Sequence, residues 1–231
     1  MGVEGLSQAR QMSDWAADAL HIAKDDIVVA STGVIGMPLP MDKVKAGIDK
    51  VSKVLYADGG HDAAQAIMTT DTVCKEMAVQ LRIDGKVVTI GAMAKGSGMI
   101  HPNMATMLGF ITTDVNIDNA ALQAAFKANI DDSFNMVSVD GDTSTNDMVA
   151  ILANGQAGNS VLTVDSPDFP AFKEALREIC IAMAQKIAGD GEGATKLIEC
   201  TVTGAATDED ARLAAKAIIA SSLVKTAGWM Q

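Results

Sequence analysis

Residues 78–94, AVQLRIDGKVVTIGAMA, contain two apolar runs that are joined by the dipeptide Asp84-Gly85. An Asp-Gly pair between apolar runs is the strongest short signal for a β-hairpin, because its type I′ turn needs a positive φ angle at both central residues. Two antiparallel strands are therefore expected here. This feature excludes an all-helical chain and a purely parallel sheet.

The rest of the chain alternates between helical and β-rich patterns. The spacing of apolar residues predicts helices over 5–20, 40–55, 62–68, 119–134 and 208–221. Short β-rich runs predict further strands over 25–32, 106–114, 148–154 and 196–204. No linker or low-complexity segment marks a domain boundary. The predicted fold class is α/β, with mixed sheets packed against helices.

A long helix is expected after Ser166 and Asp168, which are both candidates for its N-cap. Its apolar positions share one face, which consists of Phe172, Leu176, Ile179, Met183 and Ile187. This face is predicted to cover a sheet.

The composition excludes several classes of protein. The net charge is −11, and phosphate binding needs clustered Lys and Arg, so we expect no nucleic-acid partner. The three cysteines are far apart and the three histidines lack ligand spacing, so no disulfide framework and no metal site are expected. No apolar run is long enough to span a membrane. These features indicate a soluble, cytoplasmic protein without a membrane partner.

Two polar motifs resemble known binding loops but lack their essential residues. In GAMAKGSG (91–98), the lysine precedes the second glycine, so the segment is not a phosphate-binding loop. In DGDTSTND (140–147), Thr145 occupies the position at which a calcium loop needs glycine. Two interpretations of 140–147 stay open: a polar turn that bonds its own backbone, or a segment that holds a neighbouring site.

Thr106 lies in KGSGMIHPNMATMLGF (95–110), at the predicted boundary between a loop and a strand. It is either an ordinary β-branched residue at the start of a strand or a nucleophile. In the second case, its hydroxyl attacks the Ala105 carbonyl and hydrolysis of the resulting ester cuts the chain. The freed α-amino group, with an ordinary pKa of about 7.7–8.0, then serves as base for the hydroxyl.

Five motifs resemble the glutamate N-acetyltransferase (ornithine acetyltransferase) family of arginine biosynthesis. In chain order they are ASTGVIGMPLPMDKVKAGI (30–48), IMTTDT (67–72), AMAKGSGMIHPNMATML (92–108), SFNMVSVDGDTSTNDMV (133–149) and DGEGATKLIECTVTGAA (190–206). The resemblance implies an N-terminal-nucleophile-like fold of the ornithine acetyltransferase type. It also implies self-cleavage between Ala105 and Thr106, which gives an α-chain portion (1–105) and a β-chain portion (106–231).

The resemblance also assigns the reaction and its residues. Thr106 would carry an acetyl group from N-acetylornithine to glutamate as an acetyl-threonine ester, which splits the exchange into two acyl transfers. Thr32 and Gly33 would stabilise the oxyanion. The substrate-binding residues would be Thr69, Lys95, Thr106 and Glu192, with Lys95 suited to a carboxylate and Glu192 to an amino group.

Further expectations follow from the same resemblance. No cofactor is implied, although acetyl-CoA is open as a second acetyl donor. The family forms dimers of cleaved pairs, which implies a heterotetramer. The chain departs from the family pattern at both ends, so it is expected to lack an N-terminal segment and a C-terminal region that binds substrate. Cys74 also stands where the family usually has proline.

Two alternatives remain open at this stage. The chain could be an N-terminal-nucleophile amidase or aminopeptidase, with water as the acceptor. It could also be an inactive fragment that keeps the motifs without the activity.

Overall fold

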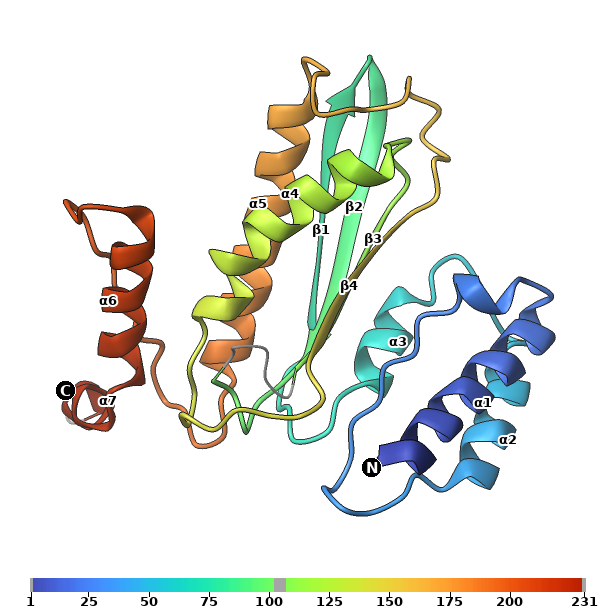
Figure 1. The fold of residues 1–231 in the computed structure, drawn as a ribbon, viewed down its shortest axis with the longest axis horizontal. Coiled ribbons are helices and arrows are strands. Elements are labelled where there is room, and N and C mark those ends of the chain that lie inside the picture. Colours follow the sequence, from blue (N-terminus) through green and yellow to red (C-terminus); the bar gives the residue numbers. More distant parts are fainter. Residues whose placement is uncertain (1, 102–106, 230–231) are drawn as a thin grey trace. The chain divides into compact units, whose positions relative to one another are not determined.

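The computed structural model describes residues 2–101 and 107–229, and the chain divides into two compact units, residues 1–61 and 62–231. The sequence shows no linker at this boundary, which falls just after the start of a helix. The first unit contains α1 (Gly2–Leu20), the short 3-10 helix η1 (Lys24–Asp26) and α2 (Met41–Val51), and α3 (Gly60–Ala66) begins at its end (Figure 1). The helices predicted over 5–20, 40–55 and 62–68 are confirmed, although α2 ends four residues early.

The second unit is built on a four-stranded sheet. Its strands are β1 (Lys75–Ile83), β2 (Lys86–Lys95), β3 (Leu108–Thr113) and β4 (Met148–Ala153), in the order β1-β2-β3-β4. The pairs β1–β2 and β2–β3 are antiparallel, whereas β4 runs parallel to β3. The sheet is therefore mixed, as predicted.

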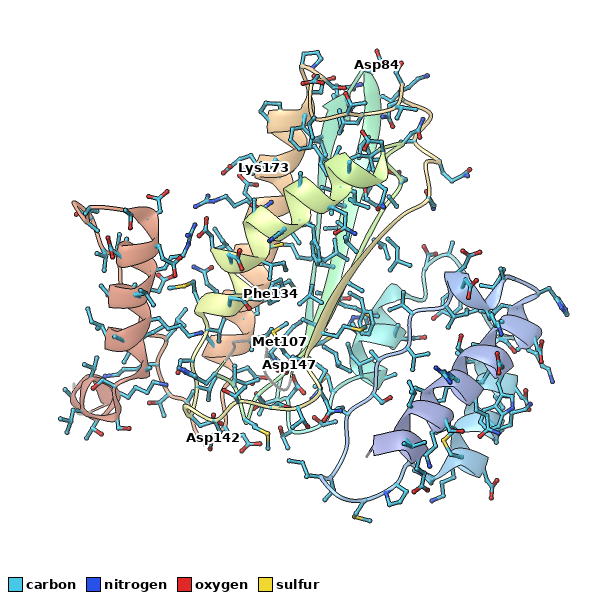
Figure 2. The ribbon with its side chains drawn as sticks, viewed as in Figure 1. Asp84, Met107, Phe134, Asp142, Asp147 and Lys173 are labelled. Carbon is cyan, nitrogen blue, oxygen red and sulfur yellow. The ribbon has the colours of Figure 1, made fainter. Side chains whose placement is uncertain are left out.

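The predicted hairpin is confirmed at the turn between β1 and β2. Asp84 and Gly85 have φ angles of 51° and 72°, as a type I′ turn requires. The Asp84 carboxylate accepts hydrogen bonds from the Ser160 N–H and hydroxyl, at 3.1 and 2.7 Å. These two bonds lower the pKa of Asp84. Figure 2 shows that this turn lies at the opposite end of the sheet from Met107 and Asp147.

One face of the sheet is covered by α5 (Phe169–Gly189), which packs on β1 and β2, and by α4 (Asn119–Asp131), which packs against α5 (Figure 1). The short helix η2 (Phe134–Met136) follows α4. All five apolar positions predicted on the α5 face are fully buried. Each such side chain contributes about 1.5–3 kcal/mol of hydrophobic stabilisation.

The predicted cap of α5 is only partly correct. Asp168 is the N-cap residue, but its carboxylate bonds no N–H of the helix. Instead it accepts the N–H of Asp84, at 2.8 Å. The Ser166 hydroxyl accepts the N–H of Thr163. The positive φ angle of Asp84 therefore has support from a carboxylate at the start of α5.

Two predicted strands are wrong. Residues 25–32 include η1 and otherwise have no regular structure, and residues 196–204 form no strand. A β-rich run becomes a strand only when a second backbone pairs with it. The first run belongs to a unit whose described elements are all helices. In the second, Glu199 accepts a hydrogen bond from Gln185 of α5, and Lys196 bonds the Gly228 carbonyl.

The remaining elements agree with the sequence within a few residues. The strand expected over 106–114 is β3, which begins at Leu108. The helix expected over 208–221 is α6 (Asp208–Ala220), whereas α7 (Ser222–Trp229), which follows it, was not predicted. Among the described residues, no helix combines the length and the apolar character that crossing a membrane requires.

Candidate functional site

A buried ion-pair network lies at the end of the sheet away from the hairpin, and Lys75 is its centre. Lys75 is the first residue of β1, and its side chain is fully buried. Its ammonium contacts Asp71 Oδ1 at 2.6 Å and Asp190 Oδ2 at 2.5 Å. Both carboxylates are also buried or nearly so. Burial costs each charge its hydration, so this arrangement depends on complete pairing.

Backbone donors supply the rest of that pairing. Asp71 accepts the N–H groups of Gly96, at 2.7 Å, and Thr69, at 3.1 Å. Burial alone would raise the pKa of Asp71, but these bonds and Lys75 together lower it. Burial would also raise the pKa of Asp190, but the hydrogen bonds from Lys75 and Thr72 lower it overall. Both groups are therefore carboxylates at neutral pH.

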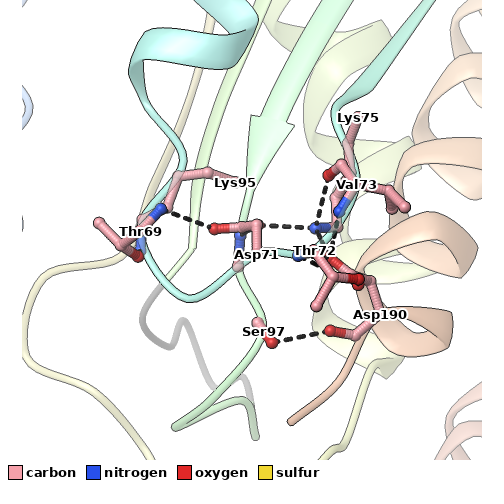
Figure 3. Close-up of polar contacts among 9 residues, drawn as sticks. Thr69, Asp71, Thr72, Val73, Lys75, Lys95, Ser97 and Asp190 are labelled. Carbon is pink, nitrogen blue, oxygen red and sulfur yellow. Dashed lines mark hydrogen bonds and ion pairs between the residues drawn. The ribbon is translucent and has the colours of Figure 1, made fainter.

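The network connects three segments that are distant in sequence, as Figure 3 shows. Thr72 donates to Asp190 through its N–H, at 3.0 Å, and through its hydroxyl. The Ser97 hydroxyl donates to the Asp190 carbonyl at 2.7 Å. Residues 69–75, the two residues after β2 and the end of α5 are thus held together by buried and partly buried hydrogen bonds, which restrict their relative movement.

Lys95 and Thr69, two of the predicted substrate-binding residues, meet beside this network. Lys95 is the last residue of β2 and is 3% exposed. Its ammonium donates to the Thr69 hydroxyl at 3.3 Å. Burial lowers the pKa of Lys95, and the carboxylates of Asp71 and Asp147 oppose the shift. A buried ammonium without an ion-pair partner among the described residues is suited to an anionic ligand group.

Glu192, the third predicted residue, contacts the segment that follows β2. Its N–H donates to the Ser97 carbonyl at 2.9 Å. Its carboxylate lies against Gly98, where a Cβ atom would come within 2.5 Å of the Glu192 Cδ. Only glycine allows this approach. The structure thus brings Thr69, Lys95 and Glu192 to one end of β2, where a cation, a hydroxyl and a carboxylate are available.

The other predicted site residues are placed differently. Thr32 and Gly33 belong to the first unit, in the irregular stretch between η1 and α2. Ala105 and Thr106 lie outside the described residues. The neighbouring Met107 is described, and its N–H donates to Asp147 Oδ1 at 2.6 Å.

Sequence reasoning missed four charged residues of this region. Their residue types are usually found at the protein surface, and no motif assigns a role to Lys75, Asp71, Asp190 or Asp147. The one local signal is a lysine at the start of an apolar strand, since a charge beside a buried run needs a partner. Asp147 was included only as a member of the polar segment 140–147. Burial raises its pKa to about 6, although the Met107 N–H and Lys95 oppose this shift.

Comparison with known proteins gives a consistent match. The model of the ArgJ family matches residues 1–230. An arginine biosynthesis bifunctional protein ArgJ from Symbiobacterium thermophilum is 59% identical over 226 residues, which cover 98% of this chain and 56% of that protein. The protein of the same name from Geobacillus stearothermophilus is 56% identical over 228 residues, which cover 98% and 55%.

A crystal structure of ArgJ from Bacillus halodurans is 54% identical, with a TM-score of 0.49, and the match covers 50% of this chain and 55% of that chain. The present chain spans about half the length of the curated relatives that it matches. The family model extends over nearly every residue, and the chain belongs to the ArgJ family.

Proposed function

We propose that this chain is part of an enzyme that moves an acetyl group from N-acetylornithine to glutamate. The observation that carries the proposal is the match of residues 1–230 to the ArgJ family, whose curated relatives are named arginine biosynthesis bifunctional proteins. The arrangement of Thr69, Lys95 and Glu192 supports it, because an amino-acid substrate carries both a carboxylate and an amino group.

Maturation comes first in this proposal. The Thr106 hydroxyl oxygen attacks the carbonyl carbon of Ala105, the C–N bond breaks, and the hydroxyl proton passes to the released amine. Water then hydrolyses the ester, which regenerates the hydroxyl and leaves a carboxylate on Ala105. The products are residues 1–105 and 106–231, and Thr106 gains a free α-amino group that serves as base.

Acetyl transfer then proceeds in two steps. Thr106 takes the acetyl group from N-acetylornithine and releases ornithine, and glutamate then attacks the ester through its amino group. Lys95 would bind the substrate carboxylate, with Thr69 beside it. Glu192 would bind the substrate amino group, and the N–H groups at Thr32 and Gly33 would stabilise the oxyanion.

We infer that the enzyme needs no cofactor and no metal, and that acetyl-CoA is the alternative acetyl donor to be assayed. The assembly would be a heterotetramer of two cleaved pairs, located in the cytoplasm. The partners are small molecules, and neither nucleic acid nor a membrane is among them.

Intact-mass measurement of the purified protein tests the first step. Two species that meet between Ala105 and Thr106 are expected, whereas Thr106→Ala should give a single uncut chain. A single uncut species in the unmodified protein would contradict self-cleavage and favour an inactive fragment.

Transfer of labelled acetyl from N-acetylornithine tests the second step. The label should appear on glutamate and depend on Thr106. Release of free acetate independently of glutamate would instead indicate the amidase. Transfer that survives in Thr106→Ala would contradict the assigned nucleophile.

A further inference from the structure

The segment 139–148 contacts the described chain on both sides of residues 102–106. On the first side, the Asp140 carboxylate accepts the N–H groups of Met99 and Ile100, the second at 3.0 Å. The N–H of Val139 donates to the Ile100 carbonyl. The Thr143 hydroxyl donates to the His101 carbonyl at 3.1 Å. Three successive residues before position 102 are therefore bonded to this one segment.

The same segment holds the residue that follows position 106. Asp147 Oδ1 accepts the Met107 N–H at 2.6 Å, and the Met148 N–H donates to the Met107 carbonyl at 3.0 Å. Both polar backbone groups of Met107 are thus bonded to adjacent residues of the segment, at the point where β3 and β4 begin to pair. Figure 2 shows Met107 and Asp147 together at this end of the sheet.

The backbone of Met99, on the first side, has a conformation that needs support. Met99 has a φ angle of 57°, and this left-handed conformation is unfavourable for a residue with a side chain. Its N–H is bonded to Asp140, which helps to maintain this conformation. Hydrogen bonds from N–H groups to a charged carboxylate are about twice as strong as neutral ones. Within its own turn, Asp140 accepts one further bond, from the Asp142 N–H at 3.0 Å.

Packing supports the anchoring on both sides. Ile100 and Met107 are 0% and 2% exposed. A Cβ atom on Gly96 would lie 3.2 Å from Ile100 and 3.3 Å from the Met107 Cβ, so both residues lie against the segment that follows Lys95. The two ends are held beside the predicted substrate-binding residues, and the five residues 102–106 connect them.

We propose that Asp140 and Asp147 are positioning residues for the self-cleavage, with one carboxylate holding the chain on each side of the cleaved stretch. The inference rests on the proposed cleavage between Ala105 and Thr106. Attack of a hydroxyl on a neighbouring carbonyl needs a narrow range of geometries, so anchoring of both ends accelerates it. After the cut, the same bonds hold the described residues on both sides, Met99 to His101 in one product and Met107 in the other.

The hydrogen bond of Asp147 can be tested by two substitutions, because only one of its carboxylate oxygens has a partner among the described residues. Oδ1 accepts the Met107 N–H, whereas Oδ2 is buried without a partner among the described residues. Asp147→Asn keeps an acceptor oxygen, whereas Asp147→Ala removes it. Asp142→Ala is the matched control, because Asp142 is exposed in the same segment and its carboxylate accepts no bond from the described residues.

The experiment follows cleavage of freshly made protein by intact mass over time. Asp140→Ala and Asp147→Ala should each slow cleavage by roughly tenfold or more, as expected when a reacting geometry is lost. Asp147→Asn and Asp142→Ala should cleave at rates within about threefold of the unmodified protein. Cleavage of both Ala variants at the unmodified rate, or an Asn variant as slow as the Ala variant, would overturn the proposal.

A second measurement separates this inference from the proposed function. In the uncut Thr106→Ala background, loss of Asp147 should speed amide hydrogen exchange at Met107 by about tenfold or more, and loss of Asp140 should do so at Met99 and Ile100. Unchanged exchange would overturn the anchoring even if the protein cleaves. If the unmodified protein does not cleave, the proposed maturation fails and exchange still decides on the anchoring. Circular dichroism verifies folding, and Asp→Leu replaces any Ala variant that does not fold.

Discussion

At the scale of single residues, the place of the Glu192 carboxylate depends on Gly98. The roles of Thr69, Lys95 and Glu192 came from the resemblance of their motifs, and two of these residues prove to be in contact. The buried residues that hold them could not be predicted. Lys75 and Asp190 are 115 positions apart, and no local pattern records a contact over such a separation.

Gly98→Ala should weaken substrate binding without unfolding the protein. The new Cβ would overlap the Glu192 carboxylate, which is the end of a flexible side chain and will move. If Glu192 binds the substrate amine as proposed, loss of this charge-assisted hydrogen bond should raise the KM for N-acetylornithine by roughly tenfold or more, with kcat little changed. The free energy of unfolding should fall by less than about 1 kcal/mol.

Steady-state kinetics of acetyl transfer, beside urea unfolding, checks this result. Gly189→Ala is the control, because a Cβ atom there meets open space. An unchanged KM in Gly98→Ala would show that Glu192 does not contact the substrate.

At the scale of secondary-structure elements, the sequence correctly predicted the features that depend only on neighbouring residues. The Asp84-Gly85 turn and the apolar face of α5 follow from a few neighbouring residues, and both are confirmed. The strands expected over 25–32 and 196–204 are wrong, because strand formation depends on a partner that local sequence does not specify. The segment 140–147 shows the same limit, since its bonds to residues 99–101 and 107 become visible only in the fold.

Lys75 is the centre of the network that connects residues 69–75, the two residues after β2 and the end of α5. Its removal should therefore lower the free energy of unfolding strongly. Lys75→Met keeps the apolar stem but leaves Asp71 and Asp190 buried without their cation. The free energy of unfolding should fall by about 3–5 kcal/mol, as for other buried ion pairs that lose one partner. Arg177→Met, which breaks an exposed pair with Glu174 on α5, should cost less than about 1 kcal/mol.

Urea unfolding followed by circular dichroism measures both changes. Equal effects of the two substitutions would contradict the assigned burial of the network. Loss of the proposed acetyl transfer is also expected in a folded Lys75→Met protein, because Thr69, Lys95 and the residues after β2 would lose their common support.

At the scale of the whole molecule, the carboxylates of this region impose opposite pH dependences on stability. The pKa values of Asp71 and Asp190 are lowered in the folded state, so their stabilisation is present above the ordinary pKa and is lost as the pH falls below about 4. The pKa of Asp147 is raised to about 6. The folded state therefore binds this proton more tightly, and its contribution declines as the pH rises from about 4 to about 6.

The Asp147 contribution can be isolated by substitution. Asp147→Asn cannot titrate, so the difference in unfolding free energy between the unmodified protein and this variant should fall as the pH rises from about 4 to about 6 and stay level above. Urea unfolding at half-unit pH intervals measures the difference, from which the titration of all other groups cancels. A difference that is constant with pH, or that grows as the pH rises, would contradict the raised pKa.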